Sequence, residues 1–520
     1  MLSIVYSAGL LGIDGFLVSV ECNSQEKMPQ FEIIGLPGLA IRESKDRIIA
    51  ALENNGYAFP ESAITVNLAP ADRKKEGSSY DLAIAVGIMQ SNYILPASLD
   101  LSRCCFIGEM SLTGTLREAK GVLCMTIAAK EAGLTEIFVP SQNVKEASVV
   151  NGVNVYGVKE LSQLIRHLCG EDMMTPHTFD FNNFAPENER TMFDMSDVKG
   201  QEKVKRALEI AAAGGHNVLM IGPPGTGKSM LAKRLPTILP EITFDEALET
   251  SKIHSIVGKL SDGLSIVTTR PFRSPHHTMS APSLVGGGPN PQPGEISLAH
   301  NGVLFLDELP EFNKAVTESL RQPLEDGKVT ITRTSGKVTY PCSFMLVAAM
   351  NPCKCGYFGH PTHKCTCKSE DIKKYMSKIS GPLLDRMDIQ VEVSSLTYDE
   401  LAVPKTSETS AQVRERVNRA RAFARERCEN AVQQDSGIPM IYRNADMSTK
   451  HLAKFCKLDE DASALLRSAY DKMGLSARGY DRLLRVARTI ADLSESVNVN
   501  KNHIAEAIQL RTLDRKYFGG

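Results

Sequence analysis

The sequence lacks an excess of charge of either sign. Its 59 lysine and arginine residues face 61 aspartate and glutamate residues, which leaves a formal net charge of −2 over 520 residues. The protein therefore does not belong to the nucleic-acid-binding proteins that are basic throughout, and any surface that binds nucleic acid must be a local patch of positive charge. At this length, with 42% hydrophobic residues, the chain is expected to fold into more than one domain with ordinary packed cores.

The N-terminus lacks the basic residues with which an export signal begins. Residues 1–20 are apolar, yet they contain three glycines and Asp14, and two short β-rich runs flank a turn. This pattern predicts a pair of strands and not a signal peptide or a membrane helix. We therefore expect a soluble cytoplasmic protein that does not associate with a membrane.

The chain also lacks internal repeats, low-complexity tracts and C-x-x-C pairs, although twelve cysteines are present. In a reducing compartment, clustered cysteines more often bind a metal ion than form disulfides. A redox role is less attractive because the resolving-thiol spacing is missing.

Strand and helix patterns divide the chain into four segments. Residues 1–168 alternate β-rich runs with helical patterns, which indicates an α+β or α/β domain. Residues 169–192 are polar, contain proline and show no periodicity, as in a linker. An α/β pattern runs through residues 193–395, and residues 396–520 show helical patterns only. The expected fold class is α/β with a helical C-terminal domain.

A phosphate-binding loop is predicted between an apolar strand at residues 218–221 and a helical pattern. The loop consists of Gly222, Pro223, Pro224, Gly225, Thr226, Gly227, Lys228 and Ser229. Its glycines let backbone N–H groups close around the β-phosphate, and its lysine reaches the β- and γ-phosphates. The Ser229 hydroxyl can take a position on Mg²⁺ at the positive end of the helix. ATP and Mg²⁺ are the expected ligands, and an accidental glycine-rich turn is the alternative.

An acidic pair ends the apolar strand within residues 302–309. Asp307 would bind Mg²⁺ through water, and Glu308 would be the base that polarises the attacking water. Alone, such a pair could simply cap a helix. Downstream of a P-loop it indicates a hydrolytic site.

Two further residues complete the expected site. Asn351 ends a buried strand at residues 344–351, where its amide can hydrogen-bond the attacking water or the γ-phosphate. Arg386 follows a short helix, and we interpret it as an arginine finger that reaches the γ-phosphate of a neighbouring subunit. A local ion pair with Asp385 or Asp388 is the alternative.

Four cysteines gather in residues 351–367, where two C-x-C pairs enclose nine residues rich in turn formers: Cys353, Cys355, Cys365 and Cys367. Four thiolates at this spacing can fold around one tetrahedral Zn²⁺. His360 or His363 could replace one cysteine, and free thiols are the other interpretation. A structural zinc here would clip the loop between Asn351 and Arg386.

In this order, the P-loop, the acidic strand end, the Asn351 strand, the LLDR segment and the helical C-terminus resemble an AAA+ ATPase. Residues 273–312 and 475–493 narrow the resemblance to magnesium-chelatase-like AAA+ proteins of the YifB/ComM type, and the match covers nearly the whole chain. The resemblance implies an AAA+ P-loop core followed by a helical lid. It also implies that Arg478 of the lid, or else Arg482, is a second arginine sensor on the γ-phosphate.

This group of proteins places two insertions around its ATPase core, and both can be found here. Residues 284–295 are a glycine- and proline-rich loop that we expect to have no regular structure. Residues 324–341, before the Asn351 strand, alternate like a hairpin with Arg333 and Lys337 beside its tip. In related hexamers this hairpin lines the central pore, so the resemblance implies that both side chains contact a DNA backbone. An ordinary solvated hairpin is the alternative.

The N-terminal third resembles the fold of the Lon protease domain, whose catalytic pair is a serine and a lysine. Ser79 lies near the nucleophile position, but Met125 stands where the lysine is expected. A hydroxyl without its base is not activated, which predicts a non-proteolytic domain. Lys120, about one helical turn away, is the alternative base.

As a whole, the resemblance implies an ATP-driven ring motor, a homohexamer, that acts on single-stranded or branched DNA. The implied process is branch migration or helicase action in homologous recombination during natural transformation, with recombination proteins as partners. A chelatase-like or chaperone-like remodeller of a protein partner is the second hypothesis. The basic hairpin favours the motor.

Overall fold

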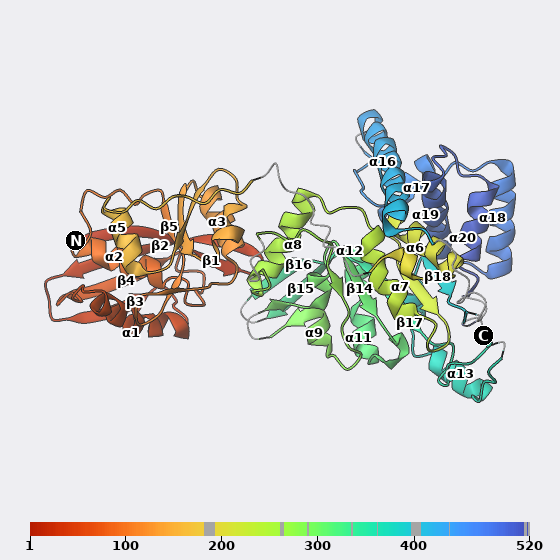
Figure 1. The fold of residues 1–520 in the computed structure, drawn as a ribbon, viewed down its shortest axis with the longest axis horizontal. Coiled ribbons are helices and arrows are strands. Elements are labelled where there is room, and N and C mark those ends of the chain that lie inside the picture. Colours follow the sequence, from red (N-terminus) through yellow and green to blue (C-terminus); the bar gives the residue numbers. More distant parts are fainter. Residues whose placement is uncertain are drawn as a thin grey trace.

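The computed structural model describes residues 1–180, 193–260, 265–288, 291–333, 336–360, 362–396, 407–435, 437–513 and residue 517. Three regions follow one another along the longest axis (Figure 1). They are an N-terminal α+β region, a central region built on a parallel sheet and a C-terminal helical region, so the expected fold class is confirmed. Most of the expected linker, residues 181–192, lies outside the described residues.

A seven-stranded mixed sheet organises the N-terminal region. In spatial order its strands are β3 (Gln30–Ile34), β4 (Ala63–Ala69), β2 (Asp14–Gln25), β1 (Leu2–Leu11), β5 (Cys104–Phe106), β8 (Glu136–Pro140) and β9 (Asn154–Val158). A separate two-stranded ribbon joins β6 (Glu109–Met110) to β7 (Leu116–Arg117). The helices of this region are α1 (Leu39–Asn54), α2 (Asp81–Ser91), α3 (Val122–Glu131), α4 (Val144–Ser148) and α5 (Leu161–Leu168).

The apolar N-terminus forms the strand pair that its sequence predicts. β1 and β2 are antiparallel from Leu2 opposite Asn23 to Leu11 opposite Asp14, so Gly12 and Ile13 make a two-residue turn. Gly12 has φ +67°, a left-handed conformation that favours glycine at this position of a tight hairpin. Within the described ranges, no helix combines the length and the apolar character that crossing a membrane requires.

The central sheet has five parallel strands. In spatial order they are β11 (Phe272–Arg273), β14 (Val303–Leu306), β17 (Met345–Met350), β10 (Val218–Ile221) and β18 (Ile389–Glu392). Every residue of β10, β14 and β17 is buried, which is why these strands appear in the sequence as continuous apolar runs. Because the strands are parallel, their carboxyl ends meet at one edge, where the segments beginning at Gly222, Asp307 and Asn351 leave the sheet.

The central region also contains α-helices and short 3-10 helices. They are η2 (Met195–Asp197), α6 (Glu202–Gly214), α7 (Lys228–Arg234), η3 (Leu235–Ile238), α8 (Phe244–Ile256), α9 (Ala281–Val285), α10 (Glu295–Leu298), η4 (Leu309–Glu311), α11 (Lys314–Ser319), α12 (Arg321–Asp326), α13 (Ser369–Met376) and α14 (Gly381–Leu384).

One insertion agrees with its prediction and the other does not. The expected hairpin is present as β15 (Lys328–Arg333) and β16 (Gly336–Pro341), and residues 334–335 of its tip lie outside the described residues. The expectation that residues 284–295 lack regular structure is wrong. A short antiparallel ladder joins β12 (Gly286–Gly287) to β13 (Gln292–Pro293). Gly286 permits this because a Cβ there would lie only 2.5 Å from the Gln292 carbonyl oxygen.

The C-terminal region contains helices and no named strand among the described residues beyond β18. Its elements are α16 (Ser410–Gln434), η5 (Asn444–Asp446), α17 (Thr449–Phe455), α18 (Glu460–Met473), α19 (Ala477–Leu493) and α20 (Lys501–Gln509). One apolar cluster includes side chains of α6, β10, α16 and α19, so the helical region shares its core with the P-loop sheet.

Candidate active site

The predicted P-loop lies between β10 and α7. Gly225 and Gly227 have φ values of +79° and +86°, and this left-handed backbone lets the loop turn sharply before the helix begins at Lys228. The Thr226 hydroxyl donates to the Pro223 carbonyl at 2.9 Å and closes the turn. The loop borders a cavity of about 380 Å³ whose other walls are Asp307, Glu308, Met350 and Asn351.

Lys228 is part of the wall of this cavity. It donates to the carbonyls of Gly222 and Pro223, both at 2.8 Å, and to the Asn351 Oδ1 at 3.1 Å. Burial lowers the pKa of Lys228, although the nearby carboxylates of Asp307 and Glu308 oppose the shift. A partly desolvated cation of this kind is well suited to attract phosphate oxygens.

Oxygen donors for a hard cation lie beside the lysine. The Ser229 hydroxyl donates to the Asp307 Oδ2 at 2.5 Å, and the Glu308 N–H donates to the Asp307 Oδ1 at 2.9 Å. A hydroxyl next to a carboxylate at a loop that faces phosphate is the donor set that Mg²⁺ prefers. The residues present therefore fit the predicted magnesium position.

Glu308 has a partner that the sequence did not reveal. Its side chain is 57% exposed, its φ is +52°, and the Nδ1 of His277 lies 3.7 Å from its Oε2. His277 follows β11, whose carboxyl end meets the same edge of the sheet. A protonated imidazole would hold this carboxylate by an ion pair. The sequence feature that could have indicated this partner is the histidine pair in RSPHH, which follows a short strand.

Arg386 and Arg478 lie in a second cavity, of about 530 Å³, whose walls include no P-loop residue among the described residues. We call it the arginine pocket. Its charged lining residues are Arg386, Arg443, Arg478, Arg482 and Arg485, together with Glu325, Asp326, Asp388, Asp446 and Asp481. The sequence alone could not show that these arginines line a different cavity from the P-loop.

The arginines of this pocket differ in how they are held. Arg386 is buried, pairs closely with Glu325 and donates to the Pro382 carbonyl at 2.7 Å. Its Nε has no hydrogen-bond partner among the described residues. The ion pair proposed as an alternative for Arg386 therefore exists, but with Glu325 and not with Asp385 or Asp388.

The two candidate lid sensors also differ. Arg482 is half-buried, and its Nε lies 3.5 Å from the Asp388 Oδ1. Burial lowers the pKa of Arg482, although the nearby Asp388 carboxylate opposes the shift. Arg478 is exposed one helical turn earlier on α19. Its guanidinium is thus the more accessible of the two to a ligand that enters the pocket.

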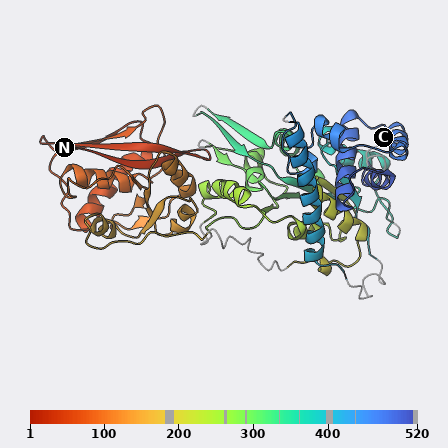
Figure 2. The same cartoon turned by 90° about the horizontal axis from the view of Figure 1, so that it is seen from above.

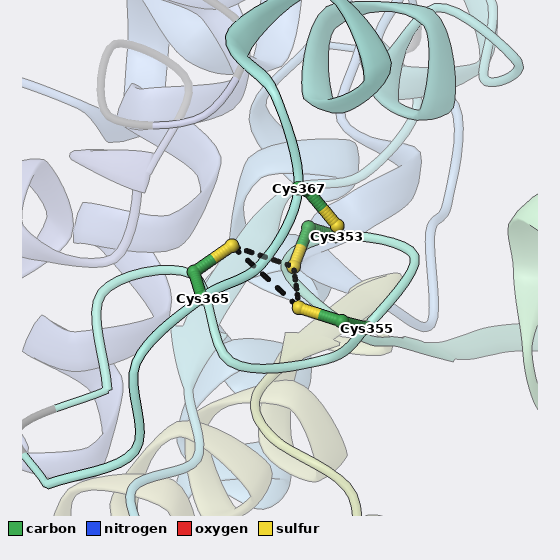
Figure 3. Close-up of side chains that lie close together, drawn as sticks. All are labelled: Cys353, Cys355, Cys365 and Cys367. Atoms are coloured by element: carbon green, nitrogen blue, oxygen red, sulfur yellow. Dashed lines mark hydrogen bonds between the residues drawn. The ribbon is translucent and has the colours of Figure 1, made fainter.

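The four predicted cysteines converge on one point (Figure 3). The Sγ of Cys353 lies 3.4 Å from that of Cys355 and 3.7 Å from that of Cys365, and the last two are 3.6 Å apart. With Cys367, all four sulfur atoms lie within 4.8 Å of one another. Tetrahedral Zn–S bonds of about 2.3 Å place sulfurs roughly 3.8 Å apart, so the cluster fits a structural Zn²⁺.

His360 does not compete for this position. The Nε2 of His360 lies 3.0 Å from the Ser395 hydroxyl, and its Nδ1 accepts from the backbone N–H groups of Thr362 and His363. Both ring nitrogens of His360 are therefore engaged within the loop. Among the described residues, the group of three or more histidine, cysteine or carboxylate side chains that could hold one metal ion consists of the four cysteines.

The cysteine loop also packs against the P-loop. Gly356 has φ +87°, and a Cβ there would lie 2.5 Å from the Cδ of Pro224. Cys353 itself is two residues beyond Asn351, which accepts from Lys228. A metal ion held by this loop would therefore stabilise the backbone on which the phosphate site rests.

We expect purified protein to contain about one zinc ion per chain. Binding of the ion is coupled to folding of this loop, so the free energy of metal binding stabilises the folded loop. Replacing Cys365 and Cys367 by serine should release the metal and weaken binding of a fluorescent ATP analogue, since the loop contacts Pro224. Elemental analysis and fluorescence titration measure the two effects. Cys169→Ser is the matched control, because Cys169 is exposed and outside the cluster. Metal-free protein with full nucleotide affinity would identify the four cysteines as ordinary thiols.

The residues considered for a Lon-type active site lie in different surroundings. Met125 is buried in a cluster with Ile107 and Ile137. The alkyl chain of Lys120 packs beside Gly258 of the central region, where a Cβ would meet its Cε at 3.1 Å. Ser79 is half-buried. The prediction that the region has no peptidase activity still rests on the absence of a lysine at the position of Met125.

The two basic residues of the β15–β16 hairpin are both exposed. Arg333 pairs with Gly336 and Lys337 with Thr332, so alternation along the strands directs the two side chains to opposite faces. Lys337 shares its face with the exposed Lys328, and Arg333 lies beside Gly287 of the glycine-rich loop. The hairpin therefore presents positive charge on both faces near its tip.

Comparison with known families gives three matches. The family described as magnesium chelatase, subunit ChlI, matches residues 194–401, and its C-terminal family matches residues 407–511. The family described as subunit ChlI of Mg-chelatase matches residues 20–143. Together the three matches span the N-terminal, central and C-terminal regions.

Two of the similar proteins cover 99% of the chain, and a third covers part of it. Competence protein ComM of Haemophilus influenzae is 42% identical over 521 residues, which cover 99% of this chain and 98% of that protein. The uncharacterised protein YifB of Escherichia coli is 40% identical over 518 residues, covering 99% and 98%. The magnesium-chelatase 38 kDa subunit of Rhodobacter capsulatus is 26% identical over 337 residues, covering 61% and 85%.

Proposed function

Since this chain belongs to the YifB/ComM family of magnesium-chelatase-like AAA+ ATPases, we propose that it is an ATP-driven ring motor that acts on DNA. The observation that carries the ATPase assignment is the cavity shared by Lys228, Ser229, Asp307, Glu308 and Asn351. These residues follow three adjacent strands of one parallel sheet, the arrangement in which α/β proteins bind nucleotides.

Each side chain of the cavity has a role in this proposal. Lys228 attracts the β- and γ-phosphates, and Ser229 with Asp307 would hold Mg²⁺, which neutralises phosphate charge when bound. Glu308 accepts a proton from the attacking water, and Asn351 orients that water or the γ-phosphate. His277 keeps the Glu308 side chain at the mouth of the cavity.

The arginine pocket supports a ring assembly, which we propose to be a homohexamer. Arg386 and Arg478 share a cavity that is separate from the P-loop of their own chain. They can therefore act on a phosphate only when a neighbouring subunit brings its P-loop to this pocket. On this basis, the finger Arg386 and the lid arginine Arg478 both contact the nucleotide that is bound to the neighbouring subunit.

For the DNA assignment we rely on the β15–β16 hairpin and on the relative named for competence. Positive side chains at a hairpin tip can grip phosphates without reading bases, which a moving ring requires. We propose branch migration or helicase action on single-stranded or branched DNA during recombination of incoming DNA, with recombination proteins as partners. None of the twelve cysteines forms a disulfide, which is consistent with the cytoplasm.

Joint replacement of Arg333 and Lys337 by alanine tests the DNA assignment. Binding to a four-way junction should weaken for every sequence alike, and the dependence of log affinity on log salt should fall by roughly one unit for each lost phosphate contact. DNA-stimulated ATP hydrolysis and movement of the junction should fall together. Fluorescence anisotropy at several salt concentrations and a branch-migration assay measure these effects.

A matched control removes the same charge elsewhere. Arg467 and Lys472 are exposed on α18, in the C-terminal helical region, and their joint change to alanine should leave the salt dependence as it is. A hairpin variant that moves the junction as fast as the unmodified protein would contradict the assignment. ATP hydrolysis that no form of DNA stimulates would favour a remodeller of a protein partner.

A further inference from the structure

The turn of the N-terminal β1–β2 hairpin touches the basic hairpin of the ATPase core. A Cβ on Gly12 would lie 2.3 Å from the Cγ1 of Val338, so the glycine backbone fits directly against β16. Leu10 and Ile13, on either side, pack into the same apolar cluster as Val338 and Tyr340. Figure 2 shows β1 and β2 extending from the N-terminal region towards the central region at this point.

A second contact fixes the N-terminal region relative to the core, so the position of the turn is determined. The Gly121 N–H donates to the Ser255 carbonyl at 3.0 Å, and the Ser255 hydroxyl donates to Glu146 at 2.7 Å. Leu123 of α3 packs with Ile242 and Ala247 of the core. Helix α3 therefore docks along α8 through hydrogen bonds and apolar contacts together.

The basic hairpin is also held by the glycine-rich loop. The Tyr340 hydroxyl donates to the Pro291 carbonyl at 2.7 Å, and a Cβ on Gly286 would lie 2.8 Å from the Cδ1 of Ile331. Val329, Ile331, Val338 and Tyr340 are all buried, whereas Lys328, Thr330, Lys337 and Thr339 are exposed. One face of the hairpin is thus packed against these supports as far as Ile331 and Val338, and Arg333 is exposed beyond them near the tip. The other face, with Lys328 and Lys337, is free to contact a ligand.

We infer that the β1–β2 turn of the N-terminal region positions the basic hairpin for its contact with a DNA backbone. Gly12 and its neighbours are positioning residues, because they pack against the hairpin at Val338 and do not themselves contact a DNA phosphate. A hairpin without this support would keep its charge but lose its orientation, so fewer phosphates would be contacted at once. This inference rests on the proposed function, since it takes the hairpin to be the DNA grip. It assigns the N-terminal region a role in coupling DNA to ATP hydrolysis.

The test is Gly12→Ala in the full chain. A methyl group at this point overlaps the Cγ1 of Val338, so the Val338 side chain, β16 or the turn must move, a misfit expected to weaken junction binding about 10-fold. The ATPase rate without DNA should be unchanged, while stimulation by a four-way junction should fall by a similar factor. Hydrogen–deuterium exchange of residues 328–341 in the DNA-free protein should become faster, which reports the displacement without any DNA.

Gly56→Ala is the matched control. Gly56 also lies in the N-terminal region and has a left-handed φ of +84°, but a Cβ there meets nothing within 4 Å. It carries the same backbone strain without the contact. Equal effects of Gly12→Ala and Gly56→Ala on junction binding would overturn the inference, because strain within the N-terminal region would then be the cause.

A compensating change separates the contact with Val338 from backbone strain at Gly12. Val338→Ala removes the Cγ1 that the new methyl group would meet, so Gly12→Ala/Val338→Ala should bind the junction more tightly than Gly12→Ala alone. Absence of rescue together with unchanged exchange of the hairpin in Gly12→Ala would refute the positioning role. Faster exchange of the hairpin with unaltered junction binding would also refute it. Failure of the proposed function is distinguishable, because Arg333→Ala/Lys337→Ala would then leave junction binding intact.

Discussion

Glu308→Gln is expected to bind ATP normally and to hydrolyse it on the order of 10²-fold more slowly, or worse. Lys228, Ser229 and Asp307 remain in place to hold the nucleotide, whereas the amide cannot accept a proton from water. Lys228→Ala should lose binding as well, because the cation that faces the phosphates is removed. Steady-state phosphate release and titration with a fluorescent ATP analogue separate the two outcomes.

The neighbouring Glu311 provides the control for this prediction. It ends η4, pairs with Lys378 at 3.3 Å and does not line the P-loop cavity. Glu311→Gln should therefore turn over ATP at the unmodified rate. Unchanged turnover in Glu308→Gln would mean that another group activates the water, and His277, 3.7 Å away, would be the first to examine.

Arg386→Ala should bind ATP yet lose hydrolysis by about 10³- to 10⁵-fold, the effect of removing an arginine finger in other nucleotide hydrolases. The loss should be one of catalysis and not of folding. Arg386 pairs with Glu325, whose side chain is 52% exposed, so water can solvate the carboxylate that the substitution leaves behind. Thermal unfolding of the variant checks this point.

Mixing experiments decide whether the finger acts between subunits. Arg386→Ala subunits retain a P-loop and Lys228→Ala subunits retain a finger, so co-assembled rings should regain activity at mixed interfaces. Arg443→Ala is the control, because it removes another cation from the same pocket, one held by Asp446 at 2.8 Å. Mixtures that co-assemble without recovering activity would make Arg386 a structural residue of its own chain.

Much of the P-loop cavity could be predicted from short patterns in the sequence. Apolar runs that end in a glycine-rich loop, in Asp307–Glu308 or in Asn351 predict strands, and parallel strands bring their carboxyl ends to one edge. The β15–β16 hairpin and the cysteine cluster follow the same logic, because alternation and ligand spacing involve residues that are close in the chain. The family resemblance added the order of the regions and the roles of the arginines.

Local pattern failed where backbone pairing depends on a distant partner or a special conformation. The 284–295 loop was expected to be irregular because it contains glycine and proline, but Gly286 lets β12 approach β13 closely. Similarly, Arg478 and Arg482 lie one turn apart on α19 and look equivalent in sequence. Only the packing of α19 near Asp388 engages Arg482 and leaves Arg478 exposed.

By itself, the sequence determined which residues could bind phosphate, magnesium, zinc or a DNA backbone, because these choices depend on side-chain chemistry and short spacing. The tertiary structure alone decided which of them share a cavity. It separated Arg386 from Lys228, brought His277 to Glu308, and seated Gly356 against Pro224 and Gly12 against Val338. Such contacts join segments distant in the chain, and they arise from how whole elements pack, which no short pattern of residues specifies.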